Sequence, residues 1–143
     1  MRETQIAAET PVSELMADII VKIPSTATMV DAADALSAGD VGLVAIIDED
    51  RVLGVISERD VVGAVAHRTP LERTLAVDAA SKDLAWCDVD STVGEVANEM
   101  TDRYIRHVLV ERHGKLVGIV SARDLLGFYA TQDEIDPADF YNG

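Results

Sequence analysis

Apolar and polar positions along the chain follow a pattern that occurs twice. Apolar residues at i, i+3, i+4 and i+7 predict an amphipathic helix after Thr28, and the same spacing recurs after Thr92. Thr28 and Thr92 each precede an acidic residue by three positions, which is typical of a helix capping box. The two apolar faces are made of Met29, Ala32, Ala33 and Leu36, and of Val93, Val96, Ala97 and Met100.

Two strands are predicted after each helix, because the chain there is rich in β-branched residues. They lie at 43–47 and 52–56, and again at 107–110 and 116–120, with polar turns that predict hairpins. A last helix begins near Ser57 or Ser121, and a helical turn at 12–16 or 76–80, leading to a short strand at 19–21 or 84–86, opens each copy. The last helices are expected to bury Val61, Val62 and Val65 in one copy, and Leu125, Leu126 and Tyr129 in the other.

The two copies are a gapless internal repeat. The segment GVISERDVVG, 54–63, recurs as GIVSARDLLG, 118–127, so the offset is 64 residues. An internal repeat of this kind indicates that the fold is built from two similar structural units. We expect repeats at 8–67 and 74–131, joined by a linker at 68–73 in which Pro70 discourages a continuous helix. The acidic tail 132–143 is expected to be mobile, although Phe140 and Tyr141 could dock on a neighbour.

One repeat of about 60 residues is marginal for stability by itself. Its three-stranded sheet would be covered by helices on one face only. Packing the two sheets face to face would bury both open faces. The sequence therefore predicts an α+β fold of two β-α-β-β-α repeats, related by pseudo-twofold symmetry, with clefts between the halves.

Charge and composition exclude several kinds of partner. The net charge of −14 is divided evenly between the two halves, and no basic stripe is present, which argues against nucleic acid and anionic membranes. The segment Met1–Gln5 has no apolar signal region, and the longest apolar run, Val41–Ile47, is far shorter than the ~20 residues of a spanning helix. We expect a cytoplasmic protein. Cys87 is the only cysteine, which excludes an internal disulfide and favours a small buried apolar residue.

The element order and the duplicated Gly-Val-Ile-Ser-Glu-Arg-Asp motif resemble CBS domains, which pair into a Bateman module. The resemblance covers roughly residues 10–131. It implies a stand-alone regulatory sensor without catalysis or a catalytic cofactor. An adenine nucleotide (AMP, ADP or ATP) would bind in the cleft between the repeats and signal through a change in repeat or dimer packing. S-adenosylmethionine or NAD are alternative adenosyl ligands. The resemblance also implies a homodimer, and output through an unidentified effector protein.

The same resemblance assigns roles to individual residues. Asp60 and Asp124 would hold the ribose hydroxyls. Arg106 and His107 would face the phosphates, whereas the corresponding residues Gly42 and Leu43 cannot, so the two sites would be unequal. The remaining phosphate-binding residues would be Ser57, Arg59, Ser121 and Arg123, and the adenine would lie against Ile20, Val41, Leu84 and Ile105.

These residue types suit the ligand on physical grounds. A helix N-terminus has unpaired backbone N–H groups and a dipole that favours an anion, and Arg matches phosphate geometry. Ser-x-x-Asp at a helix start can equally be a capping box and nothing more. Arg59 and Arg123 favour nucleotide binding over capping alone, because a cation in the first helical turn costs about 0.3–1 kcal/mol of helix stability unless an anion lies nearby. Arg106 and His107 can also be solvated strand residues, and the four apolar residues plain core.

Other chemistries lack the residues that they need. The sequence has no phosphate-binding loop of the P-loop type and no Gly-x-Gly-x-x-Gly after a strand. A calcium loop starting at Asp48 would have Leu53 in place of its glycine and Arg59 in place of its glutamate. His67, His107 and His113 have no metal-binding spacing. Two alternatives remain open: a structural or protein-interaction module with empty clefts, and a small enzyme that acts on nucleotides.

Overall fold

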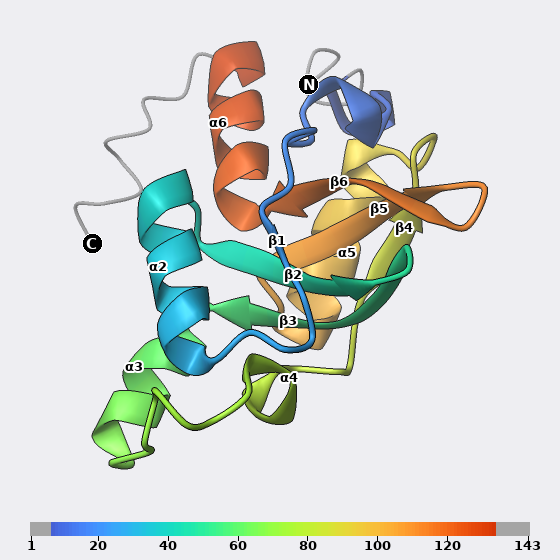
Figure 1. Cartoon of the computed structure of the whole chain (residues 1–143). Coiled ribbons are helices and arrows are strands. Elements are labelled where there is room, and N and C mark those ends of the chain that lie inside the picture. Colours follow the sequence, from blue (N-terminus) through green and yellow to red (C-terminus); the bar gives the residue numbers. More distant parts are fainter. Residues whose placement is uncertain (1–6, 134–143) are drawn as a thin grey trace. The chain divides into compact units, whose positions relative to one another are not determined.

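The computed structural model describes residues 7–133 and divides the chain into two compact units. One unit is continuous in sequence and contains residues 19–84. The other is split and contains, of the described residues, 7–18 together with 85–133. Each unit has its own three-stranded sheet and its own helices (Figure 1). We call them the continuous unit and the split unit.

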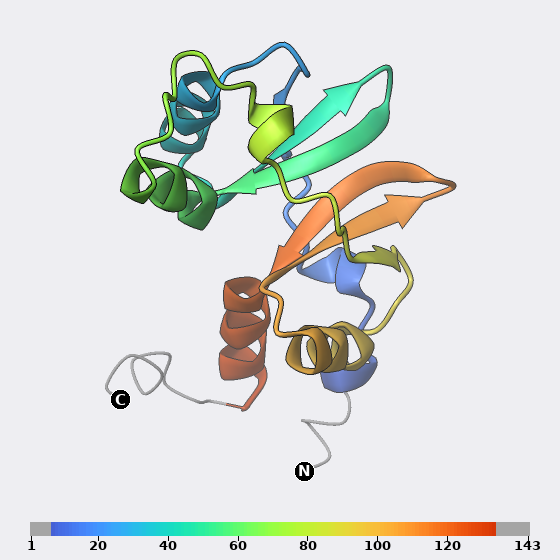
Figure 2. The ribbon, with the colours of Figure 1, turned by 90° about the horizontal axis from the view of Figure 1, so that it is seen from below.

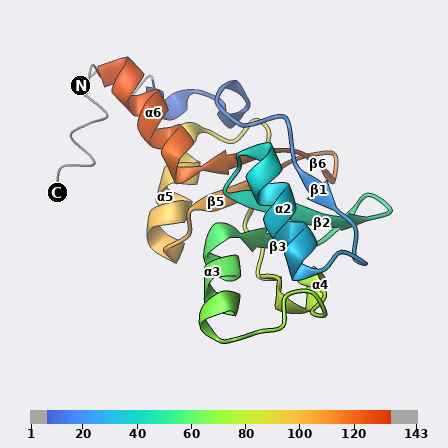
Figure 3. The ribbon, with the colours of Figure 1, turned by 60° about the vertical axis from the view of Figure 1, so that its left-hand side comes forward.

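The continuous unit is built on a sheet in the order β1-β2-β3, with β1 parallel to β2 and β2 antiparallel to β3. Helices α2 and α3 contact each other as well as the sheet, and they lie side by side in Figure 3. The elements are β1 (Lys22–Ile23), α2 (Met29–Gly39), β2 (Leu43–Asp48), β3 (Arg51–Ser57), α3 (Glu58–Ala66) and α4 (Ala76–Ala79).

The split unit repeats this arrangement with the order β4-β5-β6 and the same strand directions. Helices α5 and α6 contact each other, as Figure 2 shows. A short 3-10 helix, η1, also belongs to this unit and follows the helical residues 7–9. The elements are η1 (Val12–Glu14), β4 (Trp86–Asp88), α5 (Val93–Arg103), β5 (His107–Arg112), β6 (Lys115–Ser121) and α6 (Ala122–Asp133).

Both predicted capping boxes are confirmed. The Thr28 side chain accepts a hydrogen bond from the Asp31 N–H, and the Asp31 carboxylate accepts one from the Thr28 N–H. Thr92 and Glu95 make the same reciprocal pair at the start of α5. These bonds use two N–H groups that a helix start leaves unpaired. The faces beyond them enter the two cores, with Met29, Ala32 and Leu36 buried on α2 and Val93, Val96 and Met100 buried on α5.

The segment that opens each sequence repeat packs on the other repeat. Val12 donates its backbone N–H to the Ser91 carbonyl at 2.7 Å, and Ala17 and Ile119 exchange two backbone hydrogen bonds. In the continuous unit, Ala76 donates to the Ala27 carbonyl at 2.9 Å. The packing units therefore cut across the repeats expected at 8–67 and 74–131.

Some expectations about local structure are wrong. The short strands expected at 19–21 and 84–86 lie at Lys22–Ile23 and Trp86–Asp88, and Ile19 is 83% exposed. Helix α3 does not bury Val62 or Val65, which are 67% and 51% exposed. Leu126 on α6 is also exposed, whereas Leu125 is buried. Periodicity locates an apolar helix face, but it does not say whether anything within the chain covers that face.

The end of the described chain is helical. Helix α6 continues to Asp133, so the first two residues of the expected tail 132–143 are helical. Residues 134–143, including Phe140 and Tyr141, and the polar N-terminus 1–6 lie outside the described residues. Within residues 7–133, no helix combines the length and the apolar character that crossing a membrane requires.

Candidate functional site

The first candidate site lies where β3 runs into α3. Ser57 is the N-cap of the helix, and its N–H and hydroxyl donate to Asp60 Oδ2 at 2.8 and 3.0 Å. The Asp60 N–H donates back to Ser57 Oγ at 3.2 Å. The two side chains thus form a complete capping box. Oδ1 of Asp60 accepts no hydrogen bond from any of the described residues 7–133.

The second candidate site has the same two reciprocal backbone-to-side-chain hydrogen bonds where β6 runs into α6. Ser121 donates its N–H to Asp124 Oδ2 at 2.9 Å, and Asp124 donates its N–H to Ser121 Oγ at 3.0 Å. The capping interpretation of both Ser-x-x-Asp motifs is therefore correct. It leaves one carboxylate oxygen of each aspartate available, so it does not compete with binding of a diol.

A backbone hydrogen bond ties each helix start to the loop before the central strand. Glu58 donates to the Gly42 carbonyl at 3.1 Å, and Ala122 donates to the Arg106 carbonyl at 2.8 Å. In the split unit, His107 is also the cross-strand partner of Ser121. The backbone of Arg106 and His107 therefore lies beside the start of α6.

The arginine side chains near the two helix starts are exposed, whereas the aspartates are hydrogen-bonded in the helix caps. Arg59 and Arg123 sit in the first turns of α3 and α6 and are exposed, and Arg106 is exposed as well. None of the three makes an ion pair within the described part of the chain. An unpaired cation at the positive end of a helix dipole lowers helix stability unless an anion compensates it. These arrangements can receive a phosphate.

The four residues expected to contact adenine are all half-buried. Val41 packs against the core of the continuous unit, and Ile105 packs against that of the split unit. Both therefore have a packing role whether or not a ligand is present. Ile20 and Leu84 lie near the ends of the continuous unit.

One hollow of the split unit corresponds to no motif in the sequence. A pocket of about 200 Å³ lies between β4 and α5. Trp86, Cys87 and Ser91 line it together with Glu95 and Glu99 of α5, and Val96 and Val108 supply apolar lining. These residues come from β4, α5 and β5 and from the loop that contains Ser91, so no single sequence motif includes them. The thiol pKa of Cys87 is raised to about 11, first by burial and then by the charges of Asp88, Glu111, Glu95 and Glu99. Among residues 7–133, no three His, Cys, Asp or Glu side chains form a group that could hold a metal ion.

Several curated proteins are similar in sequence. An uncharacterised 17.7 kDa protein of Acidianus ambivalens is 31% identical over 121 residues, which cover 81% of this chain and 71% of that protein. An uncharacterised protein of Methanopyrus kandleri is 34% identical over 76% of this chain and 57% of its own length. A relative from Methanocaldococcus jannaschii is covered over only 43% of its length. The chain thus spans between 43% and 71% of the length of these relatives.

Solved structures match over most of the chain. A CBS-domain protein from Agrobacterium tumefaciens is 32% identical with a TM-score of 0.76, covering 82% of this chain and 98% of that one. A CBS domain protein from Pyrobaculum aerophilum, complexed with AMP, is 34% identical with a TM-score of 0.74 over 80% and 89% of the two chains. A CBS domain pair in complex with 5-methylthioadenosine and S-adenosyl-L-methionine is 22% identical with a TM-score of 0.78, over 85% and 97%. That last likeness shows the fold alone.

A family model for the CBS domain matches this chain twice, at residues 12–67 and 76–131. The two matches include both helix starts described above. The chain therefore belongs to the CBS domain family and carries two CBS domains in tandem.

Proposed function

We propose that this chain is a regulatory module that binds an adenine nucleotide (AMP, ADP or ATP) and performs no catalysis itself. The residues that bind it are Ser57, Arg59 and Asp60 at the start of α3, and Ser121, Arg123 and Asp124 at the start of α6. Binding changes how the repeats, or two copies of the chain, pack. An effector protein of unknown identity would receive that change. A signal of this kind requires that the ligand have different affinities for the two arrangements.

The observation that carries this proposal is the unpaired arginine at the start of each helix. Arg59 and Arg123 are exposed and have no anionic partner among residues 7–133, although the chain has a net charge of −14. A phosphate there would interact with the guanidinium and with the N-terminal end of the helix dipole. Asp60 and Asp124 each keep one oxygen for a ribose hydroxyl while the other closes the cap.

The nucleotide class is supported by a relative. The Pyrobaculum aerophilum protein, which is 34% identical over 80% of this chain, was solved in complex with AMP. The α6 site has Arg106 and His107 next to Ser121, whereas the α3 site has Gly42 and Leu43 at those positions. We therefore propose that the α6 site prefers the more highly phosphorylated ligand, with Ile20, Val41, Leu84 and Ile105 contacting the adenine.

Calorimetric titration with AMP, ADP, ATP, S-adenosylmethionine and NAD tests the proposal. Saturable binding of at least one adenine nucleotide is expected. Arg123→Ala should weaken ATP binding to the α6 site by about tenfold or more, because charge-assisted bonds to phosphate are the strong ones. Asp124→Ala should weaken adenosine as much as ATP, since it acts on the ribose. The same changes at Arg59 and Asp60 report on the α3 site.

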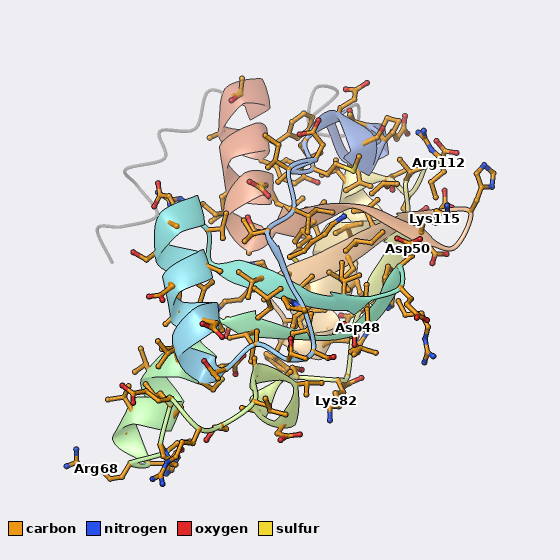
Figure 4. The ribbon with its side chains drawn as sticks, viewed as in Figure 1. Asp48, Asp50, Arg68, Lys82, Arg112 and Lys115 are labelled. Carbon is orange, nitrogen blue, oxygen red and sulfur yellow. The ribbon has the colours of Figure 1, made fainter. Side chains whose placement is uncertain are left out.

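Matched controls separate local contacts from general charge effects. Arg112 lies at the end of the β5–β6 hairpin, and Arg68 lies beyond the C-terminal end of α3 (Figure 4). Arg112→Ala and Arg68→Ala remove the same charge from the same units, so they should leave the affinity within about twofold. No heat and no thermal stabilisation with any nucleotide would contradict the proposal and favour a structural or interaction module. If S-adenosylmethionine binds more strongly than every nucleotide, it takes the place of the nucleotide as the proposed ligand.

We also propose that a second copy of this chain covers the exposed apolar residues of α3. Val62 and Val65 are 67% and 51% exposed, and α3 buries no residue within the chain. A methyl group added at Gly63 or Gly127 would meet nothing within 4 Å, so these helix surfaces are open. Apolar side chains of this kind are stabilised by association.

A further inference from the structure

We propose that the pocket between β4 and α5 binds a small organic cation, such as an alkylammonium ion, between Trp86 and the carboxylates of Glu95 and Glu99. This site goes beyond the proposed nucleotide function and does not depend on it. All of its residues belong to the split unit. The residues proposed to bind the nucleotide in that unit lie at the junction of β6 and α6, and β5 separates β6 from β4 in the sheet.

The lining combines the three features that recognise an organic cation. Trp86 contributes the indole, whose π face attracts cations more strongly than those of the other aromatic residues. Val96 and Val108 contribute apolar surface for a hydrocarbon portion. Glu95 and Glu99 contribute negative charge one helical turn apart on α5. A volume of about 200 Å³ accommodates a ligand of a few carbon atoms.

The two carboxylates are engaged only in part. Glu95 Oε2 accepts the Thr92 N–H at 3.3 Å in the capping box. Glu99 Oε1 accepts a hydrogen bond from Arg103 at 3.0 Å in a solvent-exposed ion pair. Such exposed pairs contribute little to stability, so a cation in the pocket can compete with Arg103. The second oxygen of each glutamate has no partner among residues 7–133.

Like charges four residues apart on a helix destabilise it slightly. Within the described chain the pair makes one ion pair, between Glu99 and Arg103, and the charges of Asp88 and Glu111 add to those of the pair, since all four carboxylates raise the thiol pKa of Cys87. The pocket is therefore a region of negative potential with a neutral thiol in its lining. A positively charged occupant would relieve that repulsion.

The first repeat provides an internal comparison for the pocket. It has the same order of strands and helices, but the residues that correspond to the pocket lining differ in chemistry. The residue 64 positions before Trp86 is Lys22, a cation at the place of the aromatic ring. Cys87 corresponds to Ile23, which is buried in the core, and Glu99 corresponds to Ala35. Only Glu95 has an acidic counterpart, Asp31, which closes the cap of α2. The fold does not require the chemistry of this pocket.

Trp86 is the only tryptophan of the chain, so its fluorescence reports directly on the pocket. The full-length protein is titrated with tetramethylammonium chloride and with putrescine, with sodium chloride at equal ionic strength and neutral 1,4-butanediol as references. A saturable change in emission with the organic cations is expected, with an affinity at least tenfold higher than for the neutral diol. Glu99→Gln should weaken binding by roughly threefold to tenfold, the effect of one charge in a partly solvated site.

The matched control for the second carboxylate is Asp31→Asn. Glu95→Gln and Asp31→Asn both alter a capping residue, but only Glu95 lines the pocket. Weaker cation binding in Glu95→Gln and unchanged binding in Asp31→Asn support the site, and calorimetry of Trp86→Leu should show loss of binding. Arg123→Ala should leave cation binding unchanged even if it abolishes nucleotide binding. No saturation, equal affinity for the diol, or an equal effect of Asp31→Asn would overturn the proposal.

Discussion

Val12 donates its backbone N–H to the carbonyl of Ser91 at 2.7 Å, across 79 positions of the sequence. The side chain of Val12 is fully buried in the core of the split unit, among Val93, Val96 and Val110. The segment before β1 therefore packs in the split unit, although the family model assigns it to the first CBS domain. Stability measurements on each unit should reveal this assignment.

Shortening the side chain of Val12 should destabilise the split unit. Val12→Ala removes buried methyl groups and leaves a cavity, so the free energy of unfolding should fall by about 2 kcal/mol. Hydrogen exchange should accelerate in β4, β5 and β6. Glu14→Ala, in the same 3-10 helix but exposed, should change stability by less than about 0.5 kcal/mol. Faster exchange confined to β1–β3 would contradict the assignment.

The glycines of the duplicated motif should respond in opposite ways to replacement by alanine. A Cβ at Gly118 would lie 2.5 Å from Met16 Sδ and 3.0 Å from the Ala17 carbonyl oxygen. Gly54 is equally confined, by Ala80 and the Ser81 carbonyl. Gly118→Ala and Gly54→Ala should each cost about 1–3 kcal/mol in urea unfolding. Gly63→Ala and Gly127→Ala meet nothing within 4 Å and should stabilise by about 0.5–1 kcal/mol.

The C-cap residue of helix α5 is Tyr104, which has left-handed backbone angles, φ 54° and ψ 41°, and is 94% exposed. A bulky residue is strained there, and glycine is not. Tyr104→Gly should therefore raise the free energy of unfolding by about 1 kcal/mol. Asp40 ends α2 in the same conformation, but aspartate tolerates it better, so Asp40→Gly should give a smaller gain. A loss of stability in Tyr104→Gly would mean that the ring makes contacts that offset the strain.

Local patterns in the sequence predicted the helices, hairpins and capping boxes, because these depend on neighbours within a few residues. Thr28 with Asp31, and Ser57 with Asp60, are examples in which spacing alone determines the contact. The position of the Arg106 backbone beside the start of α6 depends on how β5 and β6 pair, and it was expected only from the resemblance. The packing of Val12 on the second repeat and the exposure of Val62 were not foreseen. Both depend on which surfaces meet in three dimensions, and periodicity carries no information on that.

The exposed valines of α3 should determine self-association. Val62→Ser together with Val65→Ser should raise the dimer dissociation constant by about tenfold or more in sedimentation equilibrium, since each removes apolar surface from the proposed interface. Because each copy carries a net charge of −14, added salt should tighten association of the unmodified protein. Ser37→Ala, on the exposed side of α2, is the control. A chain that is monomeric at all concentrations would contradict this proposal.

The thiol of Cys87 should make the stability depend on pH in the alkaline range. Its pKa is raised from 9.0 to about 11 in the folded protein, so the unfolded chain loses this proton at lower pH than the folded chain does. The contribution of Cys87 is complete below about pH 9 and is lost as the pH rises to about 11. Urea unfolding of the unmodified protein minus that of Cys87→Ser should show this decline. Thiolate absorbance should have its midpoint near pH 11, and a midpoint near 9 would contradict the burial of the thiol.

The crossing of the opening segments decides which excised fragments can fold. A peptide cut at 74–131 would lack the turn around Val12 and would leave Ile119 without the backbone partner that Ala17 supplies. A peptide of residues 19–84 would keep every strand, helix and bridging segment of its own half. For the other half, a gene that joins residues 85–133 to residues 7–18 through a flexible spacer would encode one piece that contains the backbone partners of both Val12 and Ile119.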